Sequence, residues 1–146
     1  MRSWRNNHRG LTLIEVLVAL LVLSVGLVGI AALNVTSVGA AHSAYYRSLA
    51  SFIAIDGEER LWAQLGLSGS GTLSEADVTG EDGIQADWRE TWAGYMPDLQ
   101  LNMVPVAGAS TVWMDVNITV EWAEGRFEGA TTERFDYRAR TLRGAP

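Results

Sequence analysis

An apolar run that carries a single carboxylate near its start, GLTLIEVLVALLVLSVGLVGIAAL at residues 10–33, constrains this chain more than any other feature. After Glu15, residues 16–33 are 18 consecutive uncharged positions, mostly Leu, Val, Ala and Ile. A helix of that length and composition can cross a bilayer, because it satisfies its own backbone hydrogen bonds in lipid. A carboxylate in lipid costs about 2.5 to 3.5 kcal/mol on insertion scales. We therefore expect Glu15 to have a partner and a function.

The segment before the run, MRSWRNNHRG, is basic. It contains Arg2, Arg5 and Arg9 and no acidic residue. Arginines that flank a membrane segment stay on the cytoplasmic side. We expect the N-terminus in the cytoplasm and the rest of the chain, beyond the run, on the other side of the membrane.

Three modes of membrane insertion fit this N-terminus. The first is a secretory signal cleaved near residues 38–40 (Val-Gly-Ala), although the apolar core is longer than such signals have. The second is an uncut membrane anchor, which gives Glu15 no role. The third is cleavage between Gly10 and Leu11, which leaves a free amine four residues from Glu15.

The sequence Gly10-Leu11-Thr12-Leu13-Ile14-Glu15 resembles the cleavage motif of type IV pilins and type II secretion pseudopilins. The resemblance implies that a prepilin peptidase cuts after Gly10 and methylates the new N-terminal residue, Leu11, where the family usually has Phe. It also implies that the chain is a substrate and not an enzyme, and that Thr12 and Glu15 belong to an assembly site. There, the Glu15 carboxylate would neutralise the terminal ammonium of a neighbouring subunit, which sets the register and offsets two desolvation costs.

This organisation predicts four parts along the chain. They are a cleaved basic leader (1–10), the transmembrane half of a long helix (11–33), its periplasmic half (34–65) and a globular pilin head (66–146). Two glycines interrupt the membrane half, Gly26 and Gly29. They indicate either close packing of helices in lipid or a place where the helix is flexible during assembly.

The periplasmic half contains an apolar stripe with mixed three-, four- and seven-residue spacing: Tyr45, Leu49, Phe52, Ile55, Trp62 and Leu65. We expect this stripe to pack on a sheet. The charged residues Asp56, Glu58, Glu59 and Arg60 are then expected to face solvent, and Gly66 to end the helix.

A second resemblance concerns minor pilins called type IV pilus modification proteins (PilV-like). It rests on residues 24–31 (SVGLVGIA), 43–48 (SAYYRS) and 56–61 (DGEERL), where Gly57 replaces a helix former and predicts a weaker helix end. It implies a minor pilin for pilus assembly or initiation, supporting adhesion or twitching motility. The implied partners are minor and major pilins, the prepilin peptidase and the inner-membrane assembly platform. A type II secretion pseudopilin and an uncleaved membrane-anchored binding protein remain as alternatives.

The resemblance also implies a location. The subunit would be a single-pass protein of the bacterial inner membrane with a periplasmic head, and then part of the pilus on the cell surface.

The head is predicted to contain a loop, a short helix and strands. Residues 66–85 are rich in Gly, Ser, Thr and acids and indicate a loop. A helix is expected from Asp87, as its cap, to Met96, with Trp88 and Trp92 in the core. Residues 112–122 alternate between apolar and polar, and residues 99–103 and 135–140 do so as well, which predicts antiparallel strands. The fold class is therefore α+β, pilin-like, with a long N-terminal helix packed on a C-terminal antiparallel β-sheet.

Composition and charge exclude several classes of function. The formal net charge is −6, and it would become more negative without the leader arginines, so we expect no nucleic acid partner. The chain has no cysteine, which rules out disulfides and cysteine-based zinc sites. His8 and His42 have no second ligand or acid at a suitable spacing, and no catalytic base or phosphate-binding loop is recognisable. We expect no catalytic residue, metal, cofactor or small-molecule substrate.

Two charged clusters in the head have alternative interpretations. The acids of the loop, Glu75, Asp77, Glu81 and Asp82, do not have the spacing of a calcium-binding EF-hand, and we expect them to be solvated. Three arginines, Arg134, Arg138 and Arg140, lie on one face of the last strand. They are expected either to pair with Asp115 or Glu121 on the neighbouring strand or to form a strip that binds another pilin.

Overall fold

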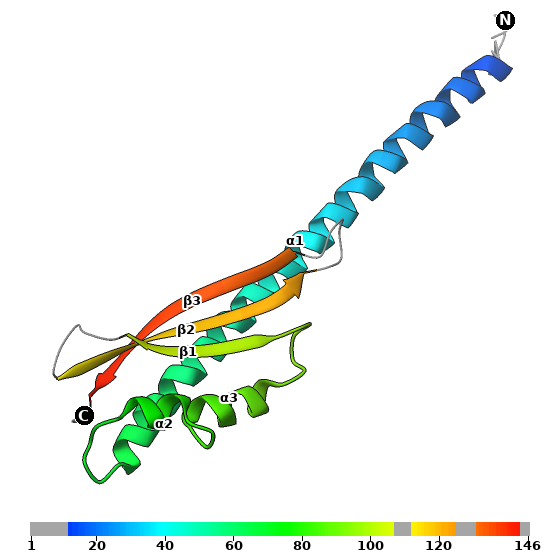
Figure 1. The fold of residues 1–146 in the computed structure, drawn as a ribbon. Coiled ribbons are helices and arrows are strands. Elements are labelled where there is room, and N and C mark those ends of the chain that lie inside the picture. The colour runs from blue at the N-terminus through cyan, green and yellow to red at the C-terminus, as the bar shows by residue number, and fades with distance from the viewer. Residues whose placement is uncertain (1–11, 107–111, 125–130, 144–146) are drawn as a thin grey trace, which may run out of the picture. The chain divides into compact units, whose positions relative to one another are not determined.

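The computed structural model describes residues 12–106, 112–124 and 131–143. The elements follow in the order α1 (Leu13–Leu67), α2 (Glu75–Thr79), α3 (Ile84–Trp92), β1 (Gln100–Val106), β2 (Trp113–Glu124) and β3 (Thr131–Leu142) (Figure 1). The chain forms two compact units, Met1–Ala40 and Ala41–Pro146. The predicted α+β class is confirmed, because a long N-terminal helix packs on an antiparallel sheet of three strands.

The described part of the first unit is the N-terminal segment of α1. Its large apolar side chains, from Leu13 to Val38, are exposed. Its hydroxyl groups are satisfied inside the helix, since Ser24 donates to the carbonyl of Leu20 at 2.7 Å and Thr36 to that of Ala32 at 3.1 Å. Among the described residues, α1 is the helix long and apolar enough to cross a membrane. Internal hydrogen bonding of this kind is what a lipid environment requires.

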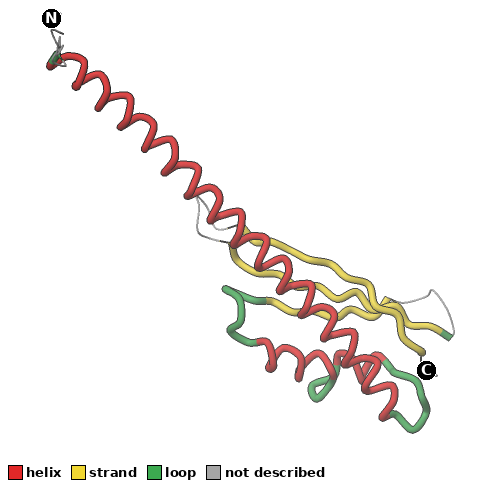
Figure 2. Tube along the Cα trace, turned by 180° about the vertical axis from the view of Figure 1, so that it is seen from behind, coloured by secondary structure: helices red, strands yellow, loops and turns green. Residues whose placement is uncertain are grey.

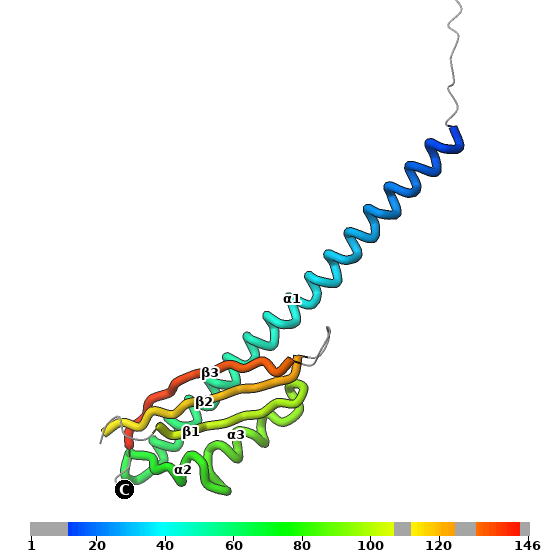
Figure 3. Tube along the Cα trace, turned by 45° about the horizontal axis from the view of Figure 1, so that its top comes forward, coloured from blue at the N-terminus to red at the C-terminus, as the bar shows by residue number. Residues whose placement is uncertain are grey.

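The sheet of the second unit has the strand order β1-β2-β3, and both pairs are antiparallel (Figure 3). Ile118 at the middle of β2 lies opposite Met103 on β1 and Tyr137 on β3. The strand alternation predicted from the sequence is confirmed on β2, where Met114, Val116, Ile118, Val120 and Trp122 are all buried. Because side chains of a strand alternate between faces, this places one face of the sheet in the core.

From Ala41 onward, α1 covers the buried face of the sheet (Figure 2). Its buried residues are mostly small or aliphatic: Ala50, Ile53, Ala54, Gly57, Leu61 and Leu65. The predicted apolar stripe is therefore wrong in most of its members, since Tyr45, Phe52, Ile55 and Trp62 are exposed. Leu65 is buried and Leu49 is partly buried against the core. Small and aliphatic side chains of α1 thus form its buried face against the sheet and α3.

Gly57 shows how close this packing is. A Cβ atom at this position would lie 2.9 Å from Cε of Met103 and 3.2 Å from the indole ring of Trp88. Gly57 thus permits the close approach of Met103 and Trp88, and this packing offsets the cost of glycine in a helix, about 1 kcal/mol relative to Ala. The sequence suggested only a weaker helix end here.

Two short helices complete the head. The segment predicted as a loop contains α2, which begins with a capping box: Ser74 Oγ accepts from the Asp77 N–H at 3.2 Å, and the Asp77 carboxylate accepts from the Ser74 N–H at 2.7 Å. The bonds that the Asp77 carboxylate accepts, from the Ser74 N–H and from the Ser74 hydroxyl at 2.7 Å, lower the pKa of Asp77. The pattern Ser-x-x-Asp is a signal for a helix start that the sequence interpretation missed.

The predicted start of α3 is also wrong. The helix is capped at Gly83 and ends at Trp92, so Asp87 lies inside it. Trp88 is fully buried, as predicted, and Trp92 is partly buried. Side chains of α3 also cover the free edge of β1, where Gln85 Oε1 accepts from the Met103 N–H at 2.6 Å and Arg89 Nε donates to the Leu101 carbonyl at 2.6 Å. An edge covered in this way offers few free groups for pairing with another strand.

Candidate assembly site

Glu15 lies in the first turn of α1 and is exposed. Its N–H donates to the Thr12 carbonyl at 3.0 Å, and the N–H of Val16 donates to the same oxygen at 3.3 Å. Thr12 therefore starts the helix and holds Glu15 in it. Within residues 12–40 Glu15 is the only ionisable side chain, so a neutralising group for it has to come from outside this segment.

The other residues predicted for this site are only partly described. Gly10 and Leu11, the predicted cleavage and methylation site, lie outside the described residues and remain predictions. A Cβ atom at Gly26 or Gly29 would meet nothing within 4 Å. Contacts within this chain therefore do not require either glycine, and both alternatives, packing against another helix or local flexibility, remain open.

Residues 5–31 match the family described as the prokaryotic N-terminal methylation motif. The matched segment contains Gly10, Glu15 and both glycines of the apolar run. No curated protein and no solved structure gives a significant match to the chain. The motif match, together with the exposed apolar helix and the α+β head, supports a membrane-associated protein of the type IV pilin or pseudopilin type, which is a substrate for N-terminal processing.

The charged residues at the end of α1 hold the head together. Arg60 Nε donates to Asp56 at 2.8 Å, its Nη2 donates to Thr91 at 3.1 Å, and it also pairs with Asp87. The Asp56 carboxylate accepts a further hydrogen bond from Trp92 Nε1 at 2.7 Å. This network ties α1 to α3, so the prediction that Asp56 and Arg60 face solvent is wrong.

Glu58 was also predicted to face solvent, and this prediction is wrong, since Glu58 is partly buried. It accepts a hydrogen bond from the Tyr137 hydroxyl on β3, and this bond raises the pKa of Tyr137. Glu59, by contrast, is exposed as predicted. The Asp56–Arg60 pair is local, four residues apart in α1. The sequence interpretation missed the other partners, Asp87, Thr91, Trp92 and Tyr137, because they come from elements far away in the chain.

The arginines of β3 are used mainly within the sheet. Arg140 Nε donates to Asp115 at 2.7 Å, and Arg134 lies 3.5 Å from Glu121, so the predicted cross-strand pairs are confirmed. The hydrogen bond from Arg140 lowers the pKa of Asp115. Arg138 donates to Asn117 at 3.2 Å. These pairs leave less free positive charge for the alternative, a strip that binds another pilin.

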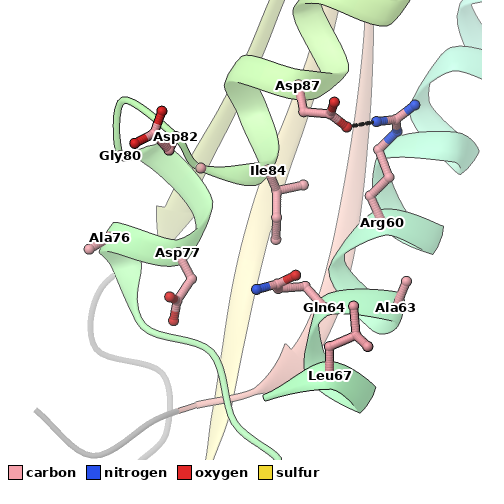
Figure 4. Close-up of a pocket in the computed structure, with 11 residues that line it drawn as sticks. Arg60, Ala63, Gln64, Leu67, Ala76, Asp77, Gly80, Asp82, Ile84 and Asp87 are labelled. Carbon is pink, nitrogen blue, oxygen red and sulfur yellow. Dashed lines mark hydrogen bonds and ion pairs between the residues drawn. The ribbon is translucent and has the colours of Figure 1, made fainter.

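An open cleft of about 460 Å³ lies between the end of α1 and the segment that contains α2 and α3 (Figure 4). Its principal polar groups already have partners in the head, since Arg60 pairs with Asp87 and Asp77 caps α2. Within the described ranges, no three His, Asp or Glu side chains are grouped so that they could hold a metal ion. In this cleft Arg60, Asp87 and Asp77 thus serve the packing of α1 against α3 and the start of α2.

Proposed function

We propose that this chain is a minor pilin of the type IV pilus, a structural subunit that takes part in assembly or initiation of the filament and supports adhesion or twitching motility. One observation carries the proposal: a lone carboxylate, Glu15, in the first turn of an exposed apolar helix, within a segment that matches the N-terminal methylation motif. The resemblance of residues 24–31, 43–48 and 56–61 to PilV-like minor pilins supports the pilus in particular.

In this proposal, processing and assembly act on the same few residues. The peptidase removes residues 1–10 and methylates Leu11, which leaves a charged amine beside the membrane segment. The Glu15 carboxylate then pairs with the amine of a neighbouring subunit. Each charge alone would be costly in lipid, and pairing offsets both costs while it selects one axial register.

The proposed location and partners follow from this chemistry. Before assembly the subunit is a single-pass protein of the bacterial inner membrane with a cytoplasmic N-terminus and a periplasmic head. Afterwards it is part of the filament at the cell surface. Its proposed partners are other minor and major pilins, the prepilin peptidase and the inner-membrane assembly platform.

A type II secretion pseudopilin is the second candidate, because its N-terminal signal is the same. Deletion of the gene separates the two. Loss of surface pili and twitching with normal protein secretion supports the minor pilin, whereas a secretion defect with normal pili supports the pseudopilin.

The mature N-terminus tests the processing step directly. Mass spectrometry of the protein from its host is expected to show a chain that starts at methylated Leu11. An intact Met1 would instead support an uncleaved membrane anchor.

Glu15→Ala tests the assembly step. The variant is expected to insert into the membrane normally, since it is more apolar, but to be reduced in filaments sheared from the cell. Thr36→Ala, a change in the same helix with no charge effect, is the control. Normal incorporation and twitching with Glu15→Ala would contradict the proposal.

A further inference from the structure

The two edges of the sheet differ in how they are covered. Side chains of α3 cover the edge of β1, through the hydrogen bonds of Gln85 and Arg89. β3 forms the opposite edge, away from α3 (Figure 3). It pairs with β2 along all of its 12 residues without a bulge, and it contains no proline. A long, regular edge strand of this kind is a template for pairing with another strand.

Hydrogen bonds at the end of β3 show which of its backbone groups point outward. The N–H of Arg143 donates to the Val112 carbonyl at 2.9 Å, toward β2, whereas the Leu142 carbonyl accepts from the Leu73 N–H at 3.1 Å on the other side. Because backbone groups of an antiparallel strand alternate in direction, the even-numbered residues of β3 direct their N–H and C=O groups away from β2. From position 132 to position 140, these outward groups have no hydrogen-bond partner in the described part of the chain.

The side chains of the same even-numbered residues form a charged row on the exposed face of the sheet. We call this row the edge row, and its members are Arg134, Asp136, Arg138 and Arg140. Arg134 pairs with Asp136 at 2.8 Å, and Arg140 pairs with Asp115 at 2.7 Å. Arg138 donates to the neutral amide of Asn117 and is in no ion pair with the described residues. The edge row therefore keeps one positive charge without an ion-pair partner, in a chain with a net charge of −6.

We propose that the edge of β3 binds an extended, acidic segment of another protein as an additional antiparallel strand, with a carboxylate opposite Arg138. In this mode of recognition, backbone hydrogen bonds supply the affinity and alternate side chains supply the specificity. A strand added along positions 132–140 pairs with the outward N–H and C=O groups. In an antiparallel pair, the side chains opposite the edge row lie on the same face of the sheet, so that opposite charges meet directly.

A second copy of this chain fits the edge row poorly. Antiparallel alignment of two copies through Asp136 places Asp136 opposite Asp136 and Arg134 opposite Arg138. The next register in one direction pairs Asp136 with Arg138. It also places Arg134 opposite Arg140, and like charges in directly opposed positions are destabilising. The next register in the other direction leaves Arg138 opposite the neutral Thr132.

A parallel alignment of two copies at this edge has a different defect. It would join the exposed face of one sheet to the face of the other sheet that α1 covers. A separate acidic segment avoids both problems, because it has no helix of its own at the edge and offers carboxylates to the arginines.

Binding of synthetic peptides to the full-length protein in detergent micelles tests the proposal. The probe alternates Val with Glu over about nine residues, and the same peptide with Lys in place of Glu is the first control. We expect fluorescence anisotropy to show binding of the Glu peptide and not of the Lys peptide. N-methylation of the Glu residues is expected to abolish binding, because their N–H groups face β3. N-methylation of the Val residues, whose N–H groups point away from β3, is expected to preserve it.

Variants of the edge row separate strand pairing from attraction between charges. Arg138→Glu is expected to weaken binding of the Glu peptide about fivefold, and Arg47→Glu, the same change of charge on α1, is the control. Asp136→Pro removes one outward N–H and no hydrogen bond to β2. It is expected to weaken binding about fivefold, although it makes the edge row more positive. Asp136→Asn changes the charge equally and is expected to bind at least as tightly as the unchanged protein.

Several results would overturn the proposal. They are equal binding of the Glu and Lys peptides, loss of binding on methylation of Val and not of Glu, and tighter binding by Asp136→Pro, which would indicate attraction between charges alone. A dimer of this protein that excludes the peptide would identify a second copy as the occupant and would overturn the proposal as well. Circular dichroism of each variant confirms that the head is folded. If Asp136→Pro does not fold, the methylated peptides and Arg138→Glu still decide.

Discussion

The indole Nε1 of Trp88 donates a hydrogen bond to the main-chain carbonyl of Ile53 at 3.0 Å, which joins α3 to α1 inside the core. Both side chains are fully buried. The bond and the ring packing fix the distance between the two helices, and the same ring is the neighbour that Gly57 accommodates.

Removal of this indole ring should destabilise the head strongly. Trp88→Ala is expected to lower the free energy of unfolding by about 3 to 5 kcal/mol, because it leaves a cavity. Trp62→Ala, on the exposed face of α1, is expected to lower it by about 1 kcal/mol, because 45% of this side chain is already exposed. Urea unfolding of the full chain in detergent micelles, followed by circular dichroism, measures both. Similar losses for the two variants would contradict the assignment of the core face.

A bulky side chain in place of Gly57 should destabilise the head. Gly57→Leu is expected to cost about 1 to 3 kcal/mol, because the added atoms collide with Trp88 and Met103. The matched control is Gly66→Leu, also in α1, where a Cβ atom meets nothing within 4 Å. This control is expected to be neutral or slightly stabilising, since leucine is the better helix former. The close approach at Gly57 would be disproved by equal unfolding midpoints for the two variants.

The hydrogen bond from Tyr137 to Glu58 should contribute measurably to stability. Tyr137→Phe is expected to lower the free energy of unfolding by about 1 kcal/mol, whereas Tyr95→Phe, at an exposed site, should have little effect. A double-mutant cycle with Glu58→Gln isolates the pairwise energy. If the two single changes are simply additive, the bond contributes nothing.

The pair of Asp115 and Arg140 should make stability depend on acid pH. The pKa of Asp115 is lowered in the folded protein by the hydrogen bond from Arg140. Its stabilising contribution is therefore fully present above the ordinary aspartate pKa, about 3.9, and is lost as the pH falls through the folded value. Asp115→Asn is expected to lower stability at neutral pH and to flatten the fall in melting temperature between about pH 5 and pH 3. Asp82→Asn, which changes the charge equally, is the control, and a wild-type slope in Asp115→Asn would contradict this prediction.

Much of the fold follows from the regular patterns of the sequence. The apolar run after Glu15 predicts the membrane-spanning helix, and the alternation on β2 predicts a sheet with one buried face. The cross-strand pair of Arg140 and Asp115 was expected for the same reason, because the period of a strand determines which side chains share a face. The motif around Glu15 likewise predicted the candidate assembly site, which stays a prediction.

The sequence by itself determined the long helix, the strands and the place of the lone carboxylate, because these depend on local periodicity and on the cost of charge in lipid, but it did not reveal α2 or the start of α3. Only the tertiary structure decided which face of α1 is buried. That helix carries apolar residues on both faces, and the choice depends on the shape of the surface it meets. The buried face lies close to the ring of Trp88 and the side chain of Met103 at Gly57, whereas Phe52 and Trp62 lie on the exposed face.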